Sequence, residues 1–531
     1  MIILNHKIQK YLIFSSLILV NSLLIWSFIT YQEFWYVYLI FLALTSVYNS
    51  LSSIYLWCKS SKFEKKLEEI SKRYSFVYVI PCYNESKEEL NNTINSLENQ
   101  ENVDIHKKML IVICDGKVKN SDEEKRTDQI LVEDIYRDYI VESVRIEKAY
   151  KTWDGEWNDI TFYFGTKNYT PFILLIKDKN YGKRDSLVLI RRVLYNFKKF
   201  KIDSDNFSSF FISSMFLSLS GVFRNYNIDF IIGTDADTVF EKSCSDRLIE
   251  SVVNEKENVV GCVGFVVVSD EMNKKSFLTL YQNAEYIFAQ CLKRRLQSLL
   301  TYKVSCLSGC VQIIKICEEL CGEKVLSKFN YLPRQDENIF KHILSYASED
   351  RNHICIAFTE HPYILTIQNT YAIAYTKTPD NLSVFLSQRR RWSLGATLND
   401  VLLIIKPNII LIERINAFIN VFTFTLFPFI LVANAYFILA LIFNRDLLLL
   451  YLSIPMIIPF IYGLSIPLVI KRTENIKEIL YFYLGFAIYS TVGFLLNMLV
   501  GLYAIYNLDV IKWGKTRQIK REEKLVIETF V

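Results

Sequence analysis

Uncharged hydrophobic stretches lie near both ends of the chain, while apolar and polar positions alternate in its middle. Residues 11–30 carry no charged side chain, and residues 34–57 form a second stretch of the same kind. About 20 apolar residues are enough to cross a bilayer as a helix. Two successive stretches without a small-residue cleavage site favour membrane helices over a cleaved signal peptide. The pattern therefore predicts an N-terminal membrane region over residues 1–58.

The chain becomes apolar again after residue 400. A mixed segment at 401–412 is typical of a helix on the membrane surface. The following region, 413–511, contains three apolar blocks: 415–443, 447–470 and 479–506. We expect Pro428 to break the first of them. The first two are long enough to be spans.

Lysine and arginine flank the last block, 479–506, on both sides. The positive-inside rule then predicts that both of its ends are cytosolic, as is the tail at 512–531. Gly485, Gly493 and Gly501 offer places to bend. We therefore expect this block to be a re-entrant or interfacial helix pair that does not cross the membrane.

Residues 59–400 have the pattern of a soluble α/β domain. Short apolar runs alternate with helical segments, and lysines outside the first two spans place this domain in the cytosol. Such alternation predicts a mostly parallel sheet with helices on both faces. Charged stretches at 117–168 and 200–207 are expected to be insertions or surface loops. The predicted strands cover residues 75–80, 109–114, 172–176, 229–234 and 259–268.

Composition limits the classes of partner. Hydrophobic residues make up 51% of the 531 positions, and the net charge of +5 is dispersed, so the chain lacks the basic patch of a nucleic-acid-binding protein. The 11 cysteines form no C-x-x-C pair and no zinc-ligand pattern. Because most fall in the predicted cytosolic region, we expect free thiols.

Two acidic residues follow the buried run at 229–234. Asp235 and Asp237 are two positions apart, so in an extended chain their carboxylates point the same way. Paired carboxylate oxygens suit Mg²⁺ or Mn²⁺, and ligands of α/β sheets bind at the carboxyl ends of strands. On its own, such a pair is more often a solvated acidic turn.

Three further motifs follow predicted strands. In Pro81-Cys-Tyr-Asn-Glu85, the Tyr83 ring offers a stacking surface for a base and Glu85 an acceptor for uracil or ribose; Asp115-Gly116 follows the second strand. In Asn180-Tyr-Gly-Lys-Arg-Asp-Ser186, Lys183 and Arg184 could meet a diphosphate at a helix start. Each motif alone also fits an ordinary turn or basic loop.

The second half contains short motifs that composition does not explain. Glu349-Asp-Arg351 resembles a solvated charge pair, and a basic cluster before a membrane segment commonly touches lipid head groups. The motifs are Tyr281-Gln-Asn-Ala-Glu-Tyr286, Cys306-Leu-Ser-Gly-Cys310, Glu349-Asp-Arg351, Gln388-Arg-Arg-Arg-Trp392 and Trp513-Gly-Lys-Thr-Arg517.

Taken in order, these nine motifs resemble the chitin synthase series, in the compact form without appended domains. Gly-Lys-Arg-Asp-Ser and Gln-Arg-Arg-Arg-Trp are the most specific, whereas Asp-x-Asp is shared by many sugar transferases. Two positions depart from the family pattern: Ser308 stands where proline is usual, and Ser348 where glycine is usual. These departures affect the detail of the acceptor loop.

The resemblance implies a GT-A domain of glycosyltransferase family 2. It would transfer N-acetylglucosamine from UDP-N-acetylglucosamine, with inversion and processively, to a growing β-1,4 chain. The membrane helices would form an export channel in a multi-pass protein of the plasma membrane or an equivalent membrane. Its partners would be the nucleotide sugar, the chitin chain and membrane lipid, and a homodimer is compatible with it.

Two alternatives belong beside this interpretation. A hyaluronan or cellulose synthase shares Asp-x-Asp and a related Gln-x-x-Arg-Trp, although Gly-Lys-Arg-Asp-Ser and the triple arginine weigh against it. A catalytically dead scaffold or polysaccharide channel would not need Asp235, Asp237 and Asp350.

The resemblance also assigns roles to residues. Asp350 would be the catalytic base, with Glu349 and Arg351 beside it, and Asp237 with Asp235 would hold a divalent metal, Mg²⁺ or Mn²⁺. The remaining roles are donor binding by Tyr83, Glu85, Asp115, Lys183 and Asp235; acceptor binding by Gln388, Arg391, Trp392, Gln282, Glu285 and Gly309; and an unassigned C-terminal motif of Trp513, Thr516 and Arg517.

Overall fold

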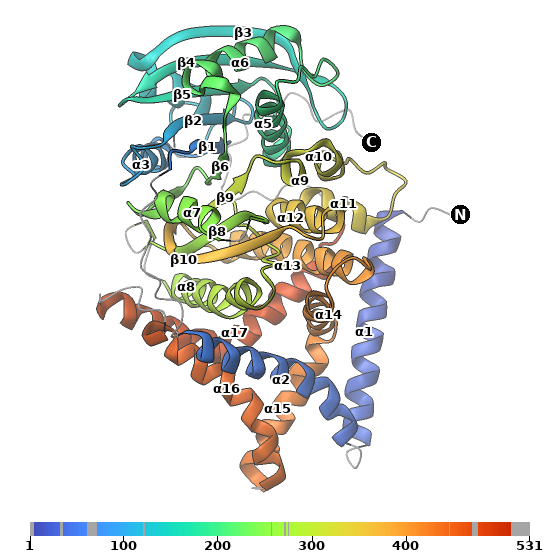
Figure 1. Ribbon diagram of the computed structural model, residues 1–531. Coiled ribbons are helices and arrows are strands. Elements are labelled where there is room, and N and C mark those ends of the chain that lie inside the picture. The colour runs from blue at the N-terminus through green and yellow to red at the C-terminus, as the bar shows by residue number, and fades with distance from the viewer. Residues whose placement is uncertain are drawn as a thin grey trace.

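The structure is a computed structural model in which an α/β body rests on a layer of helices (Figure 1). It describes residues 5–31, 35–60, 72–120, 123–255, 257–269, 272–273, 276–444, 447–469 and 476–510. The Trp513–Arg517 motif and the predicted tail at 512–531 lie outside the described residues.

One ten-stranded sheet forms the centre of the body, in the order β3-β4-β5-β2-β1-β6-β9-β8-β10-β7. The strands β5, β2, β1 and β6 are mutually parallel neighbours, and antiparallel pairings predominate toward both edges. The strands are β1 (Ser75–Cys82), β2 (Lys107–Cys114), β3 (Ile140–Lys151), β4 (Trp157–Lys167), β5 (Thr170–Lys177), β6 (Phe230–Gly233), β7 (Thr238–Phe240), β8 (Val259–Val268), β9 (Gln312–Lys315) and β10 (Leu365–Thr376). The predicted α/β fold is confirmed.

Helices cover both faces of the sheet because its strands are apolar on both sides. In β1, Val77 and Val79 belong to one core and Phe76 and Tyr78 to the other. The first core includes residues of α5 (Gly182–Lys199) and α6 (Ser209–Val222); the second includes residues of α3 (Lys87–Glu98) and α7 (Cys244–Val253).

Of the two alternatives for residues 117–168, insertions or surface loops, the loop alternative is wrong for most of the segment. Strands β3 and β4 form a hairpin within it that extends the sheet beyond β5. Buried positions alternate along the first half of β4, so Asp159, Thr161 and Tyr163 occupy the opposite face. Residues 200–207 are irregular, as expected.

A layer of helices separates the sheet from the membrane side. It contains α8 (Phe277–Ala289), α12 (Glu349–Glu360) and α13 (Leu382–Ile405). Short helices lie between strands and this layer: α9 (Glu318–Cys321), α10 (Glu323–Phe329) and α11 (Ile339–Tyr346).

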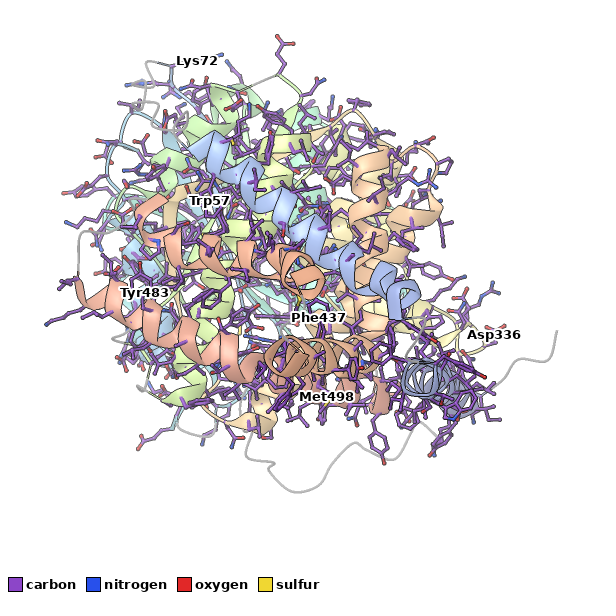
Figure 2. All side chains as sticks on the ribbon, turned by 90° about the horizontal axis from the view of Figure 1, so that it is seen from below. Trp57, Lys72, Asp336, Phe437, Tyr483 and Met498 are labelled. Atoms are coloured by element: carbon purple, nitrogen blue, oxygen red, sulfur yellow. The ribbon has the colours of Figure 1, made fainter. Side chains whose placement is uncertain are left out.

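The membrane-side helices come from both ends of the chain. They are α1 (His6–Thr30), α2 (Trp35–Ser60), α14 (Leu411–Thr425), α15 (Phe427–Asn444), α16 (Leu447–Val469) and α17 (Ile476–Tyr506). Seen from below, residues from α2, α15 and α17, among them Trp57, Phe437 and Met498, share this face (Figure 2). Within the described residues, α1 and α17 are each long and apolar enough to cross a membrane. The bent pair α14–α15 would be a third candidate if its two helices together form one span.

One predicted membrane element is wrong in form. No separate helix covers 401–412, because α13 continues to Ile405 and ends before Pro407; proline disfavours helical geometry in the residue before it. The break predicted at Pro428 within 415–443 is confirmed, because this segment consists of two helices bent by 80°, and the second begins at Phe427.

The prediction of a broken helix pair at 479–506 is also wrong, because α17 is one continuous helix of 31 residues. Its glycines do not bend it. A Cβ at Gly485 would lie 2.3 Å from the carbonyl oxygen of Leu280 in α8. Glycine is therefore used here for close helix packing, a use that a count of glycines could not distinguish from bending.

Candidate functional site

Four parallel strands end at the same edge of the sheet, and their following loops surround one large cavity. The cavity has a volume of about 2220 Å³ and extends from these loops to the membrane-side helices. Strand β9, antiparallel to β6, begins at this edge and brings the preceding 306–310 loop there. The sheet topology therefore brings five chain segments, the four strand ends and the 306–310 loop, to one site.

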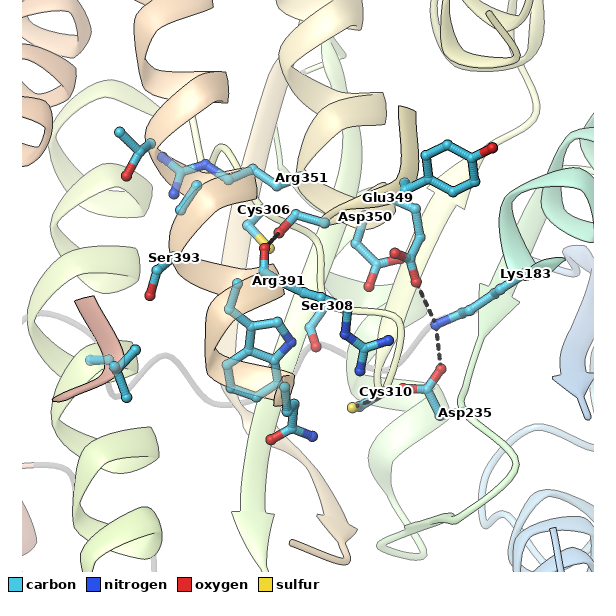
Figure 3. A pocket seen from close by; sticks show the side chains of 18 of the residues that line it. Lys183, Asp235, Cys306, Ser308, Cys310, Glu349, Asp350, Arg351, Arg391 and Ser393 are labelled. Atoms are coloured by element: carbon cyan, nitrogen blue, oxygen red, sulfur yellow. Dashed lines mark hydrogen bonds and ion pairs between the residues drawn. The ribbon is translucent and has the colours of Figure 1, made fainter. Parts of the chain in front are cut away.

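Lys183 lines the cavity and stands between two acidic residues, Asp235 and Glu349 (Figure 3). Its Nζ lies 2.6 Å from Asp235 Oδ1 and 3.5 Å from Glu349 Oε1. Burial alone would lower the pKa of this ammonium, but Asp235, Asp350 and Glu349 together raise it well above its usual value. Lys183 is thus a permanently charged group at this position.

Gly309 occupies the point where these charges meet. Its backbone N–H donates to Asp350 Oδ2 at 2.7 Å. A Cβ at this position would lie 2.6 Å from Lys183 Nζ and 2.9 Å from Asp350 Oδ2. Only glycine leaves room for the lysine and the carboxylate together.

Asp350 has the features of a proton acceptor. Its Oδ2 is held by Gly309, whereas its Oδ1 is buried and receives no hydrogen bond from the described residues. Burial and the nearby charges of Glu349 and Asp235, partly offset by Lys183 and by the Gly309 N–H, raise its pKa to about 6. A carboxylate with this pKa is ionised at neutral pH and still basic enough to take a proton.

The two aspartates of the Asp-x-Asp motif provide hard oxygen donors for a divalent cation. No cluster of three or more potential ligands occurs among the described residues. The Lys183 ammonium bound to Asp235 shows that this carboxylate already attracts a cation, and the charge of Lys183 lowers its pKa against the effect of burial. Asp235 and Asp237 line the same cavity, so they fit a cation whose other ligands would come from a diphosphate.

The predicted donor residues gather at one end. Tyr83, Glu85, Asp115 and Lys183 all line the cavity. The Glu85 carboxylate accepts from the Tyr83 backbone N–H at 2.6 Å, which fixes the turn after β1. The Asp115 carboxylate is buried and accepts from the Tyr181 N–H at 3.1 Å.

Lys177, the last residue of β5, was not predicted. Its side chain is fully buried, and its Nζ lies 2.5 Å from Asp115 Oδ1 and 2.8 Å from Asp185 Oδ2. Asp185 also accepts from the Tyr150 hydroxyl at 2.6 Å, and burial raises its pKa. This lysine joins the Asp-Gly motif to the Gly-Lys-Arg-Asp motif. A lysine closing an otherwise apolar strand was the available signal.

Arg184 does not point its guanidinium toward Lys183's partners, contrary to the idea that both basic residues meet a diphosphate. It donates to the carbonyl oxygens of Phe329 and Leu344 and to Asn352 Oδ1. These lie in α10, α11 and α12. Arg184 therefore holds the surrounding helices in place. Of these two basic residues, Lys183 is the one that faces Asp235 and Glu349.

The three arginines of the pentad have different partners, because successive helix positions differ by about 100°. Arg389 lies 2.5 Å from Glu285 Oε2 and stacks at 4.2 Å from the Trp392 ring centroid. Arg390 donates to the carbonyl oxygens of Asn507 and Val510, after the end of α17. Arg391 lines the cavity. The sequence motif predicted only the last of these as an acceptor residue.

The other predicted acceptor residues divide into two groups. Gln388, Glu285 and Trp392 line the cavity, and Trp392 has 41% of its surface exposed. Gln282 does not line it: the side chain is fully buried, and its amide nitrogen donates to the Leu278 and Pro379 carbonyl oxygens. Its connection to the site runs through Arg389, which donates to it at 3.5 Å.

Arg351 connects helices more than it contacts the cavity centre. Its guanidinium donates to Asp400 Oδ1 at 2.6 Å, and Asn352 donates to Asn399 Oδ1 at 3.0 Å. These two bonds join α12, which begins with Glu349 and Asp350, to α13, which contains the pentad.

Comparisons with known proteins agree with these motifs. A family model described as chitin synthase matches residues 53–156 and 173–529. A chitin synthase 8 from Gibberella zeae is 32% identical over 98% of this chain and 79% of its own length. A chitin synthase 8 from Verticillium dahliae is 32% identical over 82% of this chain and 76% of its own length.

Among solved structures, a mannosyltransferase from Pyrobaculum calidifontis, in complex with GDP-Man and Mn²⁺, matches 89% of the chain. Its identity is 11% and its TM-score 0.41, a likeness too weak to support an argument. The sequence matches do not share this weakness, since they cover nearly the whole chain and most of each fungal relative. The chain belongs to the chitin synthase family.

Proposed function

We propose that this family member is a processive, inverting enzyme that adds N-acetylglucosamine from UDP-N-acetylglucosamine to a β-1,4 chain and exports it through its own membrane region. The observation that carries the proposal is the place of Asp350. Asp350 lines the cavity that the Lys183–Asp235 pair and Trp392 also line, and its Oδ1 has no hydrogen-bond partner among the described residues.

The donor would bind at the strand ends. Tyr83 supplies a ring for the base, and Asp115, kept in place by Lys177, supplies a carboxylate for it. Lys183 would leave Asp235 for the diphosphate, to which it is electrostatically better matched. A divalent cation held by Asp235 and Asp237 would stabilise charge on the departing UDP.

The acceptor would bind against Trp392, whose exposed ring offers a stacking surface for a sugar. Asp350 Oδ1 would then take the proton of the attacking hydroxyl, while the Gly309 N–H keeps Oδ2 from rotating. Inversion requires that the nucleophile attack from the face opposite the leaving group. Asp350 lies in the first turn of α12 and Trp392 in α13, whereas the predicted donor residues follow strands, so the two sets come from different elements.

Export through the protein is supported by the extent of the cavity. Beyond Trp392 it continues to residues of α14 and α17, and several of these have uncharged polar side chains suited to hydroxyl and acetamide groups. They include Asn416, Asn420, Thr423, Tyr489 and Asn497. A neutral polysaccharide could follow this lining without meeting a purely apolar wall.

The orientation also stays a proposal. We propose that the catalytic domain faces the cytosol and that 11–30, 34–57, 415–443 and 447–470 cross the membrane. Both flanks of α17 are basic, so α17 would lie along the interface beneath α8, against which it packs. Cysteine labelling at position 525 in sealed vesicles tests this, because labelling from the non-cytosolic side would require a further crossing.

The reaction is tested by incubating purified protein in detergent or liposomes with radiolabelled UDP-N-acetylglucosamine and Mn²⁺. We expect labelled polymer that chitinase degrades and hyaluronidase does not. Polymer sensitive to hyaluronidase would indicate the rival synthase. No incorporation in a folded preparation that binds UDP would favour the scaffold alternative.

A further inference from the structure

Ser348, the residue before Glu349, has a backbone conformation that favours glycine. Its φ is 50° and its ψ is 55°, in the left-handed region. For a residue with a Cβ this costs roughly 1 kcal/mol or more. Such a conformation persists only where surrounding contacts hold it.

The contacts that hold Ser348 come from α13. Its Oγ donates to the carbonyl oxygen of Arg391 at 3.3 Å. Opposite it lies Gly395, where a Cβ would come within 2.3 Å of Ser348 Oγ and 2.6 Å of Ser348 Cβ. A strained residue with a side chain therefore faces a glycine that makes room for it, and the two positions fit only as a pair.

This contact joins the two functional ends of neighbouring helices. Ser348 precedes the first turn of α12, which contains Glu349 and Asp350. Arg391 is followed by Trp392 in α13. The other bonds between the same helices, from Arg351 and Asn352, lie further along α12.

We propose that Ser348, seated against Gly395 and bonded to the Arg391 carbonyl, is a positioning residue that fixes Asp350 relative to the acceptor surface at Arg391 and Trp392. This inference rests on the proposed function. It concerns whether a sugar hydroxyl or a water molecule attacks the anomeric carbon of the donor. A sugar hydroxyl must be held at Asp350, whereas water needs no such surface.

A loosened contact would therefore shift the reaction toward hydrolysis of the donor. In that reaction the oxygen of water bonds to the anomeric carbon and the bond to the diphosphate breaks. UDP leaves with the bonding electron pair, and the proton of water passes to Asp350. The products are free N-acetylglucosamine and UDP, with no further reactant needed.

The first experiment compares Ser348→Ala and Ser348→Gly with wild type. Label is measured in polymer and in free N-acetylglucosamine, together with UDP affinity by titration. We expect the ratio of free sugar to polymer to rise about fivefold, which corresponds to the loss of one hydrogen bond of about 1 kcal/mol, with UDP affinity unchanged. Ser214→Ala is a matched control, because its Oγ also donates to a backbone carbonyl but far from the cavity.

The second experiment tests whether the side chains at positions 348 and 395 must be complementary in size. Gly395→Ala should clash with Ser348 and raise the same ratio, and adding Ser348→Gly should restore it toward that of Ser348→Gly alone. An equal defect of Gly395→Ala in both backgrounds, or an unchanged ratio in both Ser348 variants, would overturn the proposal. If the wild-type protein itself makes no polymer, the proposed function would be overturned instead.

Discussion

The proposed donor end of the cavity is made of strand ends, and the proposed acceptor end is made of helix faces. At the donor end, Tyr83, Asp115 and Asp235 each follow a strand of the parallel block β2-β1-β6. The ladder between these strands sets their relative positions, since Cys82 is paired with Cys114 and Val79 with Gly233. Backbone hydrogen bonds between the strands therefore fix where these residues stand relative to one another.

At the acceptor end, no such ladder exists. The position of Trp392 depends on Arg389, which is bound to Glu285 of α8, and the position of Asp350 relative to α13 depends on single bonds such as that of Ser348. The comparison teaches that donor geometry should tolerate loss of a side chain better than acceptor geometry does. Lys177 is the exception, because it neutralises two buried carboxylates.

The largest effect is expected at the junction of the two ends. Asp350→Asn keeps the shape of the side chain and removes its basicity, so polymer synthesis should fall roughly 10²-fold or more. UDP affinity, measured by titration, should stay within twofold of wild type. Near-normal synthesis by a purified Asp350→Asn variant would show that another group takes the proton.

Substitution of the buried Lys177 tests how well the donor end tolerates the loss of a side chain. Lys177→Met leaves Asp115 and Asp185 buried without their cation, and breaking a buried pair typically costs about 3–5 kcal/mol. We expect a lower melting temperature and at least tenfold weaker UDP binding. The double variant Lys177→Met/Asp185→Asn removes one of the two charges and should recover part of the stability. Wild-type UDP affinity in the single variant would mean that the strand ends alone place Asp115.

Loss of the exposed acceptor ring should separate the two ends cleanly. Trp392→Ala removes a stacking surface worth about 1.5 kcal/mol, so elongation should slow about tenfold while UDP binding is spared. Asp237→Ala should do the reverse and weaken UDP binding in the presence of Mn²⁺. If both variants bind UDP and Mn²⁺ as wild type does, the division into donor and acceptor ends fails.

The smallest effect is expected in the pH profile. Asp350 must be ionised to act, and its pKa is raised to about 6. The value of kcat/KM should therefore fall as the pH drops through about 6, by up to tenfold per unit. Glu349→Gln removes a negative charge that raises this pKa, so the acid limb should move to lower pH. An acid limb that does not move would show that another group controls it.

The sequence predicted that Tyr83, Asp115 and Asp235 come together, because short motifs at strand ends need only the strands to be located. It did not predict Lys177, and donor binding by the other three residues stays a prediction. It predicted the acceptor end less well. Nothing in Arg389-Arg390-Arg391 tells which arginine faces a carboxylate and which caps α17, because that depends on helices more than 100 residues away in the chain. Gln282 was misplaced for the same reason.

The helical breaks were predicted unevenly. Pro428 correctly indicated the break that the structure shows as an 80° bend between α14 and α15. In α17 the glycines suggested a break in a helix that continues, because Gly485 and Gly493 contact α8 instead. The periodicity of a sequence locates a helix but does not identify the element that packs against it.

Lys183 has a further consequence for the order in which ligands arrive. One ammonium at the centre of the site faces Asp235, Asp350 and Glu349, so the resting pocket carries an excess of negative charge. A bare nucleotide diphosphate would be repelled by that excess, whereas a nucleotide already complexed with a divalent cation would approach with its own charge largely neutralised. Electroneutrality thus favours joint entry and joint departure. Free UDP should accordingly be a weaker inhibitor when divalent cations are chelated.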